Sequence, residues 1–232
     1  MSYSSLHYLK KLKRGFLIWI TLISLLINLW LDNIRFTIFQ TKSNKKSIVQ
    51  IKRAKWFTNQ LINLGSAFIK IGQLLSARPD LIPNTWIQEL SKLQDQVPNF
   101  SFEQVKETIR KELGPKFNKI DQIFCDPVGS ASLAQVHKAT LKNGKRVVFK
   151  VQRPNLKELF IIDLGIMQQI AGLLQKNKNW SRGRNWVEIA KECRKVLMKE
   201  LDFNCEAQYA ARFRQQFLDD ENVEVPEVIW DM

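Results

Sequence analysis

The feature that most constrains the fold is a predicted β-hairpin set between helical segments. Residues 133–141 and 145–151 flank Asn143-Gly144, and the second run is rich in β-branched residues. Asn-Gly between two such runs is the strongest short-range hairpin signal, because both central residues of the favoured turn need positive φ. The final residues 223–232, "VEVPEVIWDM", predict one more strand. Because the flanking segments have helical spacing, we expect an α+β chain whose strands form one small antiparallel sheet.

Residues 53–114 predict three short helices. Apolar residues recur at three- and four-residue spacing through 56–77, and Pro79 and Pro83 then stop the helix. Asn84 is the expected N-cap of the second helix. Ser101 and Gln104 predict a capping box for the third, which Gly114 and Pro115 close. Two further helices are expected after Pro154, separated by a polar break at residues 178–186.

The positive charge is concentrated at the N-terminus. Residues 1–60 contain eleven lysines and arginines and one acid, Asp32, so they carry +10 of the total net charge of +14. Within them, Phe16–Leu31 is apolar except for Thr21, Ser24 and Asn28, and is shorter than the roughly 20 residues that cross a bilayer. We expect a short or tilted span, or an interfacial helix, on an anionic membrane surface. Trp19 and Trp30 are the candidate anchors, and a buried helix is the alternative.

The basic arm also raises the question of nucleic acid. The adjoining apolar run and the near-neutral remainder of the chain argue against that partner. Cys125, Cys193 and Cys205 are too few and too scattered for a disulfide framework or a zinc site, so no metal site is predicted. They indicate reduced thiols in a cytoplasmic-type compartment.

Lys150 is the first candidate for a chemical role. Val147, Phe149 and Val151 point to one face of the second hairpin strand, so Lys150 and Val148 share the other. A lysine on an inner strand face needs a charged partner, and a phosphate or a carboxylate would serve. The alternative is an exposed lysine on an edge strand.

Two further groups have suggestive spacing. Asp202 and Glu206 share a helix face, whereas Glu200 and Asp202 can serve one cation only if the helix breaks between residues 201 and 204. Lys70 and Gln73 are neighbours on another helix, and Gly72 between them lets another backbone approach. The alternative for each group is a solvated polar helix face.

Together these segments carry a resemblance. "KIGQ" at 70–73, "LQDQVP" at 93–98, "SASLAQVHKA" at 130–139, "VVFKVQRP" at 147–154 and "KELDFNCEA" at 199–207 occur in this order. The set resembles the UbiB/AarF family of atypical protein kinases over roughly residues 50–232. The resemblance implies a basic arm with a membrane-associating hydrophobic helix (1–50), a helical KxGQ extension (51–125) and a kinase-like small lobe of antiparallel sheet plus helix αC (126–232).

The resemblance also implies roles for particular residues. Lys150 would hold the α- and β-phosphates of ATP, with Glu206 as its αC partner and Val148 beside the nucleotide. An alanine-rich loop would replace the glycine-rich one, although here it begins with glycine and serine; its residues are Gly129, Ser130, Ala131 and Ser132. Lys70, Gly72 and Gln73 would reach toward the nucleotide region, where Lys70 would meet Glu200 and Asp202.

The sequence departs from a complete kinase. It contains no His-x-Asp catalytic loop and no Asp-Phe-Gly, so no complete catalytic set is predicted and the chain alone is not expected to transfer phosphate. We therefore expect a protein truncated after the small lobe, or one whose large lobe comes from a separate partner; Mg²⁺ would bind only with that lobe. The family implies a role in isoprenoid-quinone or prenyl-lipid metabolism at a bacterial or plastid-like membrane. The alternative is a non-enzymatic membrane-bound adaptor.

Overall fold

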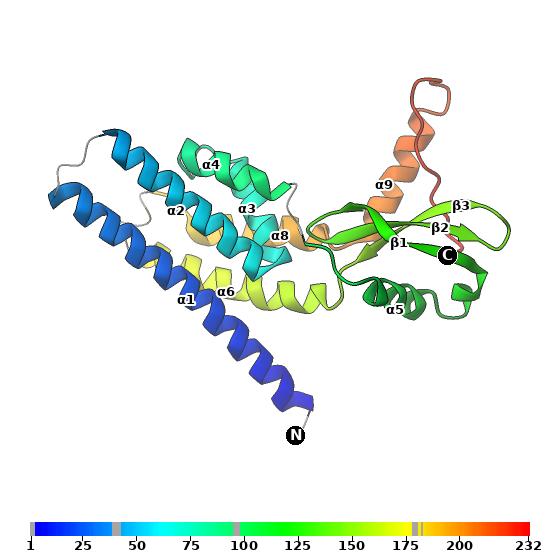
Figure 1. The fold of residues 1–232 in the computed structure, drawn as a ribbon, viewed down its shortest axis with the longest axis horizontal. Coiled ribbons are helices and arrows are strands. Elements are labelled where there is room, and N and C mark those ends of the chain that lie inside the picture. Colours follow the sequence, from blue (N-terminus) through cyan, green and yellow to red (C-terminus); the bar gives the residue numbers. More distant parts are fainter. Residues whose placement is uncertain (1–2, 39–42, 95–97, 178–180, 182) are drawn as a thin grey trace.

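The computed structural model describes residues 3–38, 43–94, 98–177, 181 and 183–232. The first helices are α1 (Tyr3–Ile38), α2 (Ser43–Leu64), α3 (Ser66–Ser76), α4 (Asn84–Leu90), the 3₁₀ turn η1 (Ser91–Gln94), α5 (Phe102–Leu113) and the 3₁₀ turn η2 (Gly114–Lys119). The strands are β1 (Ile120–Ser130), β2 (Ala134–Leu141) and β3 (Arg146–Gln152), followed by α6 (Leu156–Lys176), α8 (Trp186–Lys199) and α9 (Phe203–Gln216). Figure 1 shows the first four helices with α6 and α8 as a bundle at one end, and the sheet with α5 and α9 at the other.

The sheet is antiparallel with the order β1-β2-β3, which confirms the predicted α+β class. The β2–β3 hairpin turns at Asn143-Gly144, where Gly144 has φ 81° and Asn143 Oδ1 accepts from Lys145 N at 3.0 Å. Strand β1 was not predicted, because its register shifts spoil the alternation that marks a strand. The predicted strand at 223–232 is wrong: these residues join no sheet in the described part of the chain. Pro226 lies in its middle and has no N–H to donate.

The helix boundaries required three corrections. The single helix predicted over 56–77 is two helices, because Gly65 adopts φ 86° and ψ −164° between α2 and α3. Helix α2 also begins much earlier, at Ser43, so it runs through the domain boundary expected at residue 50. Asn84 is the first residue of α4, and Pro83 occupies the N-cap position. The Ser101–Gln104 capping box is confirmed, whereas the polar break at 178–186 lies partly outside the described residues.

Two apolar clusters hold the chain together. The larger one lies in the helical bundle and includes Ile69, Leu90, Leu93, Phe160, Leu164 and Leu197, each at most 2% exposed. The smaller one lies between α5 and one face of the sheet and consists of Val105, Ile109, Ile120, Leu141 and Val151. Helix α5 covers only this face of the sheet, and the opposite face, which carries Val148, stays open to solvent.

Candidate functional site

Lys150 lies on the sheet face that α5 does not cover. Val147, Phe149 and Val151, which alternation places on one face of the strand, pack against α5. The expectation that Lys150 occupies a half-buried inner face is wrong, because its side chain is 42% exposed and Val148 beside it is 57% exposed. The apolar burial of this strand therefore comes from one face only.

The partner of Lys150 is Glu206 on the first turn of α9. Lys150 Nζ donates to Glu206 Oε1, and the ammonium lies 4.9 Å from the centroid of the Phe203 ring. The Glu206 side chain is 55% exposed, so a ligand can reach both charges. An exposed pair of this kind contributes only about 0–1 kcal/mol to stability, so folding alone does not require it.

A groove of about 1180 Å³ borders this pair. The register places Val136 opposite Lys150 and Lys138 opposite Val148, so these four side chains share the open face. Helix α9 and the C-terminal segment form the other walls. Besides Lys138, Val148 and Lys150, the lining residues include Phe124, Phe203, Ala207, Ala210, Pro226, Val228, Ile229 and Met232. The groove is thus mainly apolar, with the Lys150–Glu206 pair as a polar group on its wall.

The loop between β1 and β2 is a tight turn that does not depend on glycine. Gly129 and Ser130 end β1, and Ala131 N donates to Ala134 O at 2.8 Å. Gly129 has no positive φ, and a Cβ built there meets no atom within 4 Å. Ser132 is buried, and the buried hydroxyl of Ser130 has no hydrogen-bond partner among the described residues. The backbone conformation is therefore one that alanine can adopt.

Arg153 fastens this loop to the helical extension, a role that the sequence reasoning missed. Its Nη2 donates to Ala131 O at 3.1 Å and to Pro98 O at 2.7 Å, and its backbone N donates to Leu133 O. Burial lowers the pKa of the guanidinium, whose Nε has no acceptor in the described part of the chain. Arg153 belongs to the "VVFKVQRP" motif, but the spacing of residues within that motif does not show which distant carbonyls the arginine reaches.

The helix breaks between Lys199 and Phe203, which is the condition set above for Glu200 and Asp202 to serve one cation, although no cation is shown there. Helix α8 ends at Lys199, and Asp202 is the N-cap of α9, with Oδ1 accepting from Asn204 N and Cys205 N, each at 3.1 Å. Gln152 Nε2 donates to Leu201 O at 3.0 Å and so ties the break to the end of β3. Glu200, on the other side of the break, meets Lys70 Nζ at 2.6 Å.

The three KxGQ residues have different environments. Lys70 reaches Glu200, one of the two carboxylates expected from the resemblance, while the other, Asp202, caps α9; Gln73 Nε2 donates to Leu93 O at 2.9 Å. Gly72 faces side chains rather than the backbone that was expected: a Cβ there would lie 2.4 Å from Leu93 Cδ1 and 2.9 Å from Leu61 Cδ1. Only Lys70 of the three is seen to contact the acidic segment, and its nucleotide role stays a prediction.

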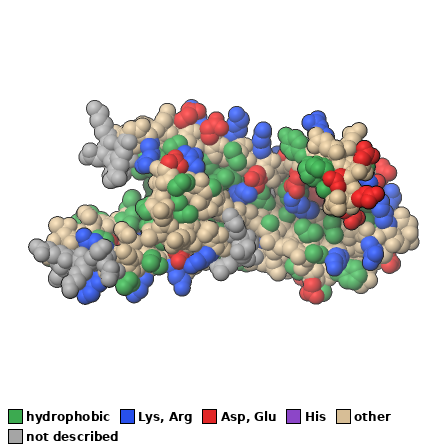
Figure 2. Space-filling model, turned by 90° about the horizontal axis from the view of Figure 1, so that it is seen from above, with side chains coloured by type: hydrophobic (Ala, Val, Ile, Leu, Met, Phe, Trp, Pro, Cys, Tyr) green, Lys and Arg blue, Asp and Glu red, His purple; other side chains and the backbone are tan. Residues whose placement is uncertain are grey.

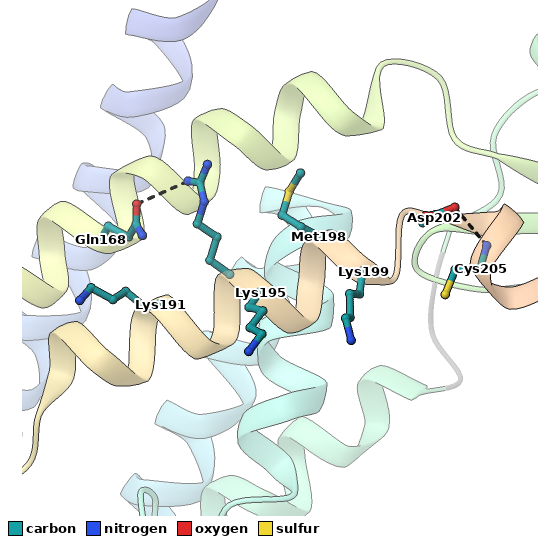
Figure 3. A pocket seen from close by; sticks show the side chains of 8 residues that line it. Gln168, Lys191, Lys195, Met198, Lys199, Asp202 and Cys205 are labelled. Atoms are coloured by element: carbon teal, nitrogen blue, oxygen red, sulfur yellow. Dashed lines mark hydrogen bonds between the residues drawn. The ribbon is translucent and has the colours of Figure 1, made fainter.

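A second, shallower hollow of about 580 Å³ lies where α6, α8 and the start of α9 meet. Figure 3 shows Lys191, Lys195 and Lys199 along α8, with Asp202 and Cys205 at the start of α9. Arg194 also lines it and donates to Gln168 at 3.4 Å. The hollow includes neither Lys70 nor Lys150, so it is separate from the groove. In the described residues no group of three or more His, Cys, Asp or Glu side chains could hold a metal ion.

Most of the chain is similar to known proteins. The ABC1 atypical kinase-like domain matches residues 92–232, more than half of the chain. An uncharacterized protein of Synechocystis, sll1770, is 45% identical over 92% of this chain and 37% of its own length. The chloroplastic "ACTIVITY OF BC1 COMPLEX KINASE 7" of Arabidopsis thaliana is 42% identical over 95% of this chain and 32% of its own. A "Probable protein kinase UbiB" of Marinobacter nauticus is 41% identical over 74% and 31%. The chain thus spans about a third of the length of these relatives.

Proposed function

The chain belongs to the ABC1 atypical kinase-like family, and from that premise we propose that it binds ATP in the groove on the open face of its sheet. Lys150 holds the α- and β-phosphates there, Glu206 orients Lys150, and Val148 borders the base. The loop of residues 129–132 covers the phosphates.

One observation carries this proposal: a lysine on the open face of the sheet contacts a glutamate of the neighbouring helix at the edge of a large groove. The residues present fit a nucleotide. The groove is mainly apolar, as a base requires, and the loop backbone has room beside Gly129. The buried hydroxyl of Ser130 in the covering loop has no hydrogen-bond partner among the described residues, so its O–H is not already committed to a protein acceptor there.

The proposed location and substrate class of the protein are based on its family. We propose that the protein works at a bacterial or plastid-like membrane on isoprenoid-quinone or related prenyl lipids, with α1 as its contact to anionic lipid. Chloroplastic and bacterial relatives and the apolar helix over Lys11–Ile38 support this location. Residues outside this sequence, in a large lobe, supply the carboxylates that hold Mg²⁺ and orient a substrate hydroxyl, since these 232 residues contain neither motif.

Replacing Lys150 with methionine tests the ATP site. The variant keeps an unbranched side chain only one atom shorter and loses the charge that would meet the phosphates. We expect ATP to raise the melting temperature of the wild-type protein and to leave that of Lys150→Met unchanged. Without ATP the free energies of unfolding of the two proteins should differ by no more than about 1 kcal/mol, because the Lys150–Glu206 pair is exposed.

Lys145→Met is the matched control. Lys145 also lines the groove and forms an exposed ion pair, with Glu227 at 2.8 Å, but it lies at the hairpin turn. Its variant should keep the ATP-induced shift. If Lys150→Met kept the shift as well, Lys150 would not hold the nucleotide and the proposed site would be wrong.

A further inference from the structure

Helix α1 has two opposite apolar sides. One faces the bundle, where Ile18 is 2% exposed and Thr21 is 9% exposed. The other faces outward and carries six large apolar side chains that are each between 46% and 70% exposed: Leu12, Phe16, Ile20, Ile23, Ile27 and Trp30. At 3.6 residues per turn these six lie within about 80° of one another around the axis, opposite the buried side. The outer stripe is thus a continuous apolar surface.

An ion pair holds each end of the apolar stretch to the bundle. Near the N-terminal end, Arg14 Nε and Nη2 donate to both carboxylate oxygens of Asp163 on α6, at 2.7 and 2.6 Å. Near the other end, Arg53 of α2 donates to both oxygens of Asp32, at 2.9 and 3.1 Å. Both aspartates are buried, with side chains 1% and 8% exposed.

These two contacts bear on how α1 meets a bilayer. Arg14 and Asp32 are about 27 Å apart along the helix, close to the roughly 30 Å thickness of a hydrocarbon core. Figure 1 shows α2 running beside α1 in the opposite direction over this length. If α1 crossed the bilayer with its partners in place, exposed polar residues of α2 such as Lys55 and Asn59 would enter the hydrocarbon. If α1 left the bundle instead, Asp163 would lose its partner.

The charges around the stripe match an anionic lipid surface. Exposed basic residues flank it on α1 and continue on α2: Lys11, Lys13, Arg35, Lys45, Lys46, Lys52 and Lys55. Asp32 is the only acid within residues 1–60, and Arg53 neutralises it. Acidic side chains gather at the opposite end of the molecule, over α9 and the C-terminal segment (Figure 2). An apolar stripe with a basic border is typical of helices that lie in the lipid headgroup region.

We propose that α1 lies in the plane of one leaflet of an anionic bilayer, with its outer stripe inserted and both of its ends on the same side. This inference rests on the membrane association proposed above and adds its geometry. The inner side of α1 stays on the bundle, so the groove beside Lys150 stays in water on the side of the membrane where both ends of α1 lie.

Labelling of single cysteines distinguishes the two geometries. The full chain, with its three native cysteines replaced by serine, receives one cysteine at Lys13 or at Asn33, both exposed. Each variant is made by cell-free synthesis with sealed vesicles of phosphatidylcholine and phosphatidylglycerol. After flotation, a maleimide that cannot cross the bilayer is added outside. We expect both positions to react fully before detergent is added.

The other outcomes of the labelling distinguish a failure of the in-plane geometry from a failure of the proposed membrane association. If one position reacts only after detergent opens the vesicles, α1 spans the bilayer and the in-plane geometry is wrong, while membrane association stands. If the protein does not float with the vesicles, the proposed membrane association fails, and the in-plane geometry fails with it.

A variant of the stripe tests which surface enters the lipid. Phe16→Ser with Ile23→Ser removes two outward side chains and should lower vesicle binding by about tenfold or more. Val196→Ser is the matched control, because Val196 is 41% exposed on α8, away from the stripe, and its variant should float as the wild type does. Undiminished flotation of the double variant would show that the outer stripe is not the inserted surface.

Discussion

Gly72 illustrates how single residues of one motif can serve different ends. Lys70 and Gln73 make polar contacts, whereas Gly72 is there because α3 packs closely on its neighbours. A Cβ at this position would lie 2.4 Å from Leu93 Cδ1, and Leu93 is fully buried. The glycine of the motif is therefore a requirement of packing, independent of any nucleotide.

We expect Gly72→Ala to destabilise the protein by about 1–3 kcal/mol, because the leucines around it must move in a filled core. Urea denaturation measures the change. Gly165→Ala is the control: Gly165 lies within α6 and a Cβ there meets nothing within 4 Å, so alanine should stabilise by up to about 1 kcal/mol. Equal stability of Gly72→Ala and wild type would mean that the leucines yield without cost.

At the scale of elements, the break between helices α8 and α9 gives two nearby acidic residues different partners. Their sequence looks like one amphipathic run, and the break at 200–202 directs Glu200 toward Lys70 while Glu206 meets Lys150. Asp202 starts the second helix by capping it. The break thus places the two acidic partners of the two lysines on different helices, joined by a short capped turn that Gln152 holds to the sheet.

Two substitutions at Asp202 separate the cap from the charge. Asp202→Ala should cost about 0.5–2 kcal/mol of stability, because two backbone N–H groups lose their acceptor. Asp202→Asn keeps an acceptor and removes the charge, so it should remain within a few tenths of wild type. Thermal unfolding checks both. If the asparagine variant fell as far as the alanine variant, the charge of Asp202 rather than its capping bond would hold the turn.

At the scale of the whole molecule, a buried ion pair joins α1 to the bundle. Asp163 is enclosed between α6 and α1, and burial raises the pKa of its carboxyl while Arg14 opposes that rise. A carboxyl whose pKa is higher in the folded than in the unfolded state binds its proton more tightly when folded. Its contribution to stability is therefore greatest at low pH and is lost as the pH rises from the unfolded pKa through the folded one.

We expect Arg14→Gln to increase the stability that is lost as the pH rises through the pKa of Asp163. Without the guanidinium the pKa of Asp163 rises further, so the variant should be close to wild type near about pH 4 and about 3–5 kcal/mol less stable near about pH 7. Melting temperatures measured across this pH range give the difference. Arg14→Lys is the control, because it keeps the positive charge, and its melting temperature should depend on pH nearly as that of the wild type does. A deficit that did not change with pH would assign the cost to lost packing of Arg14.

Much of the fold could be predicted from local signals. The hairpin at Asn143-Gly144 and the capping box at Ser101 each depend on residues a few positions apart, and local conformation decides them. Besides the strand expected at 223–232, which joins no sheet in the described residues, two elements were mispredicted because the local signal fails there. Strand β1 is irregular, and Gly65 divides a stripe of apolar residues that is continuous in the sequence.

The motifs were enough to indicate the family because the ordered set is specific, although any one of them alone is a weak signal. Alternation along β3 groups its side chains into two faces, but only the tertiary structure showed that α5 covers the face of Val147, Phe149 and Val151 and leaves the face of Lys150 open. It also decided which partners the charges find: Arg153 reaches carbonyls 22 and 55 residues away, and Arg14 reaches Asp163 at a separation of 149. Such contacts depend on how distant segments pack, and no spacing within one segment contains that information.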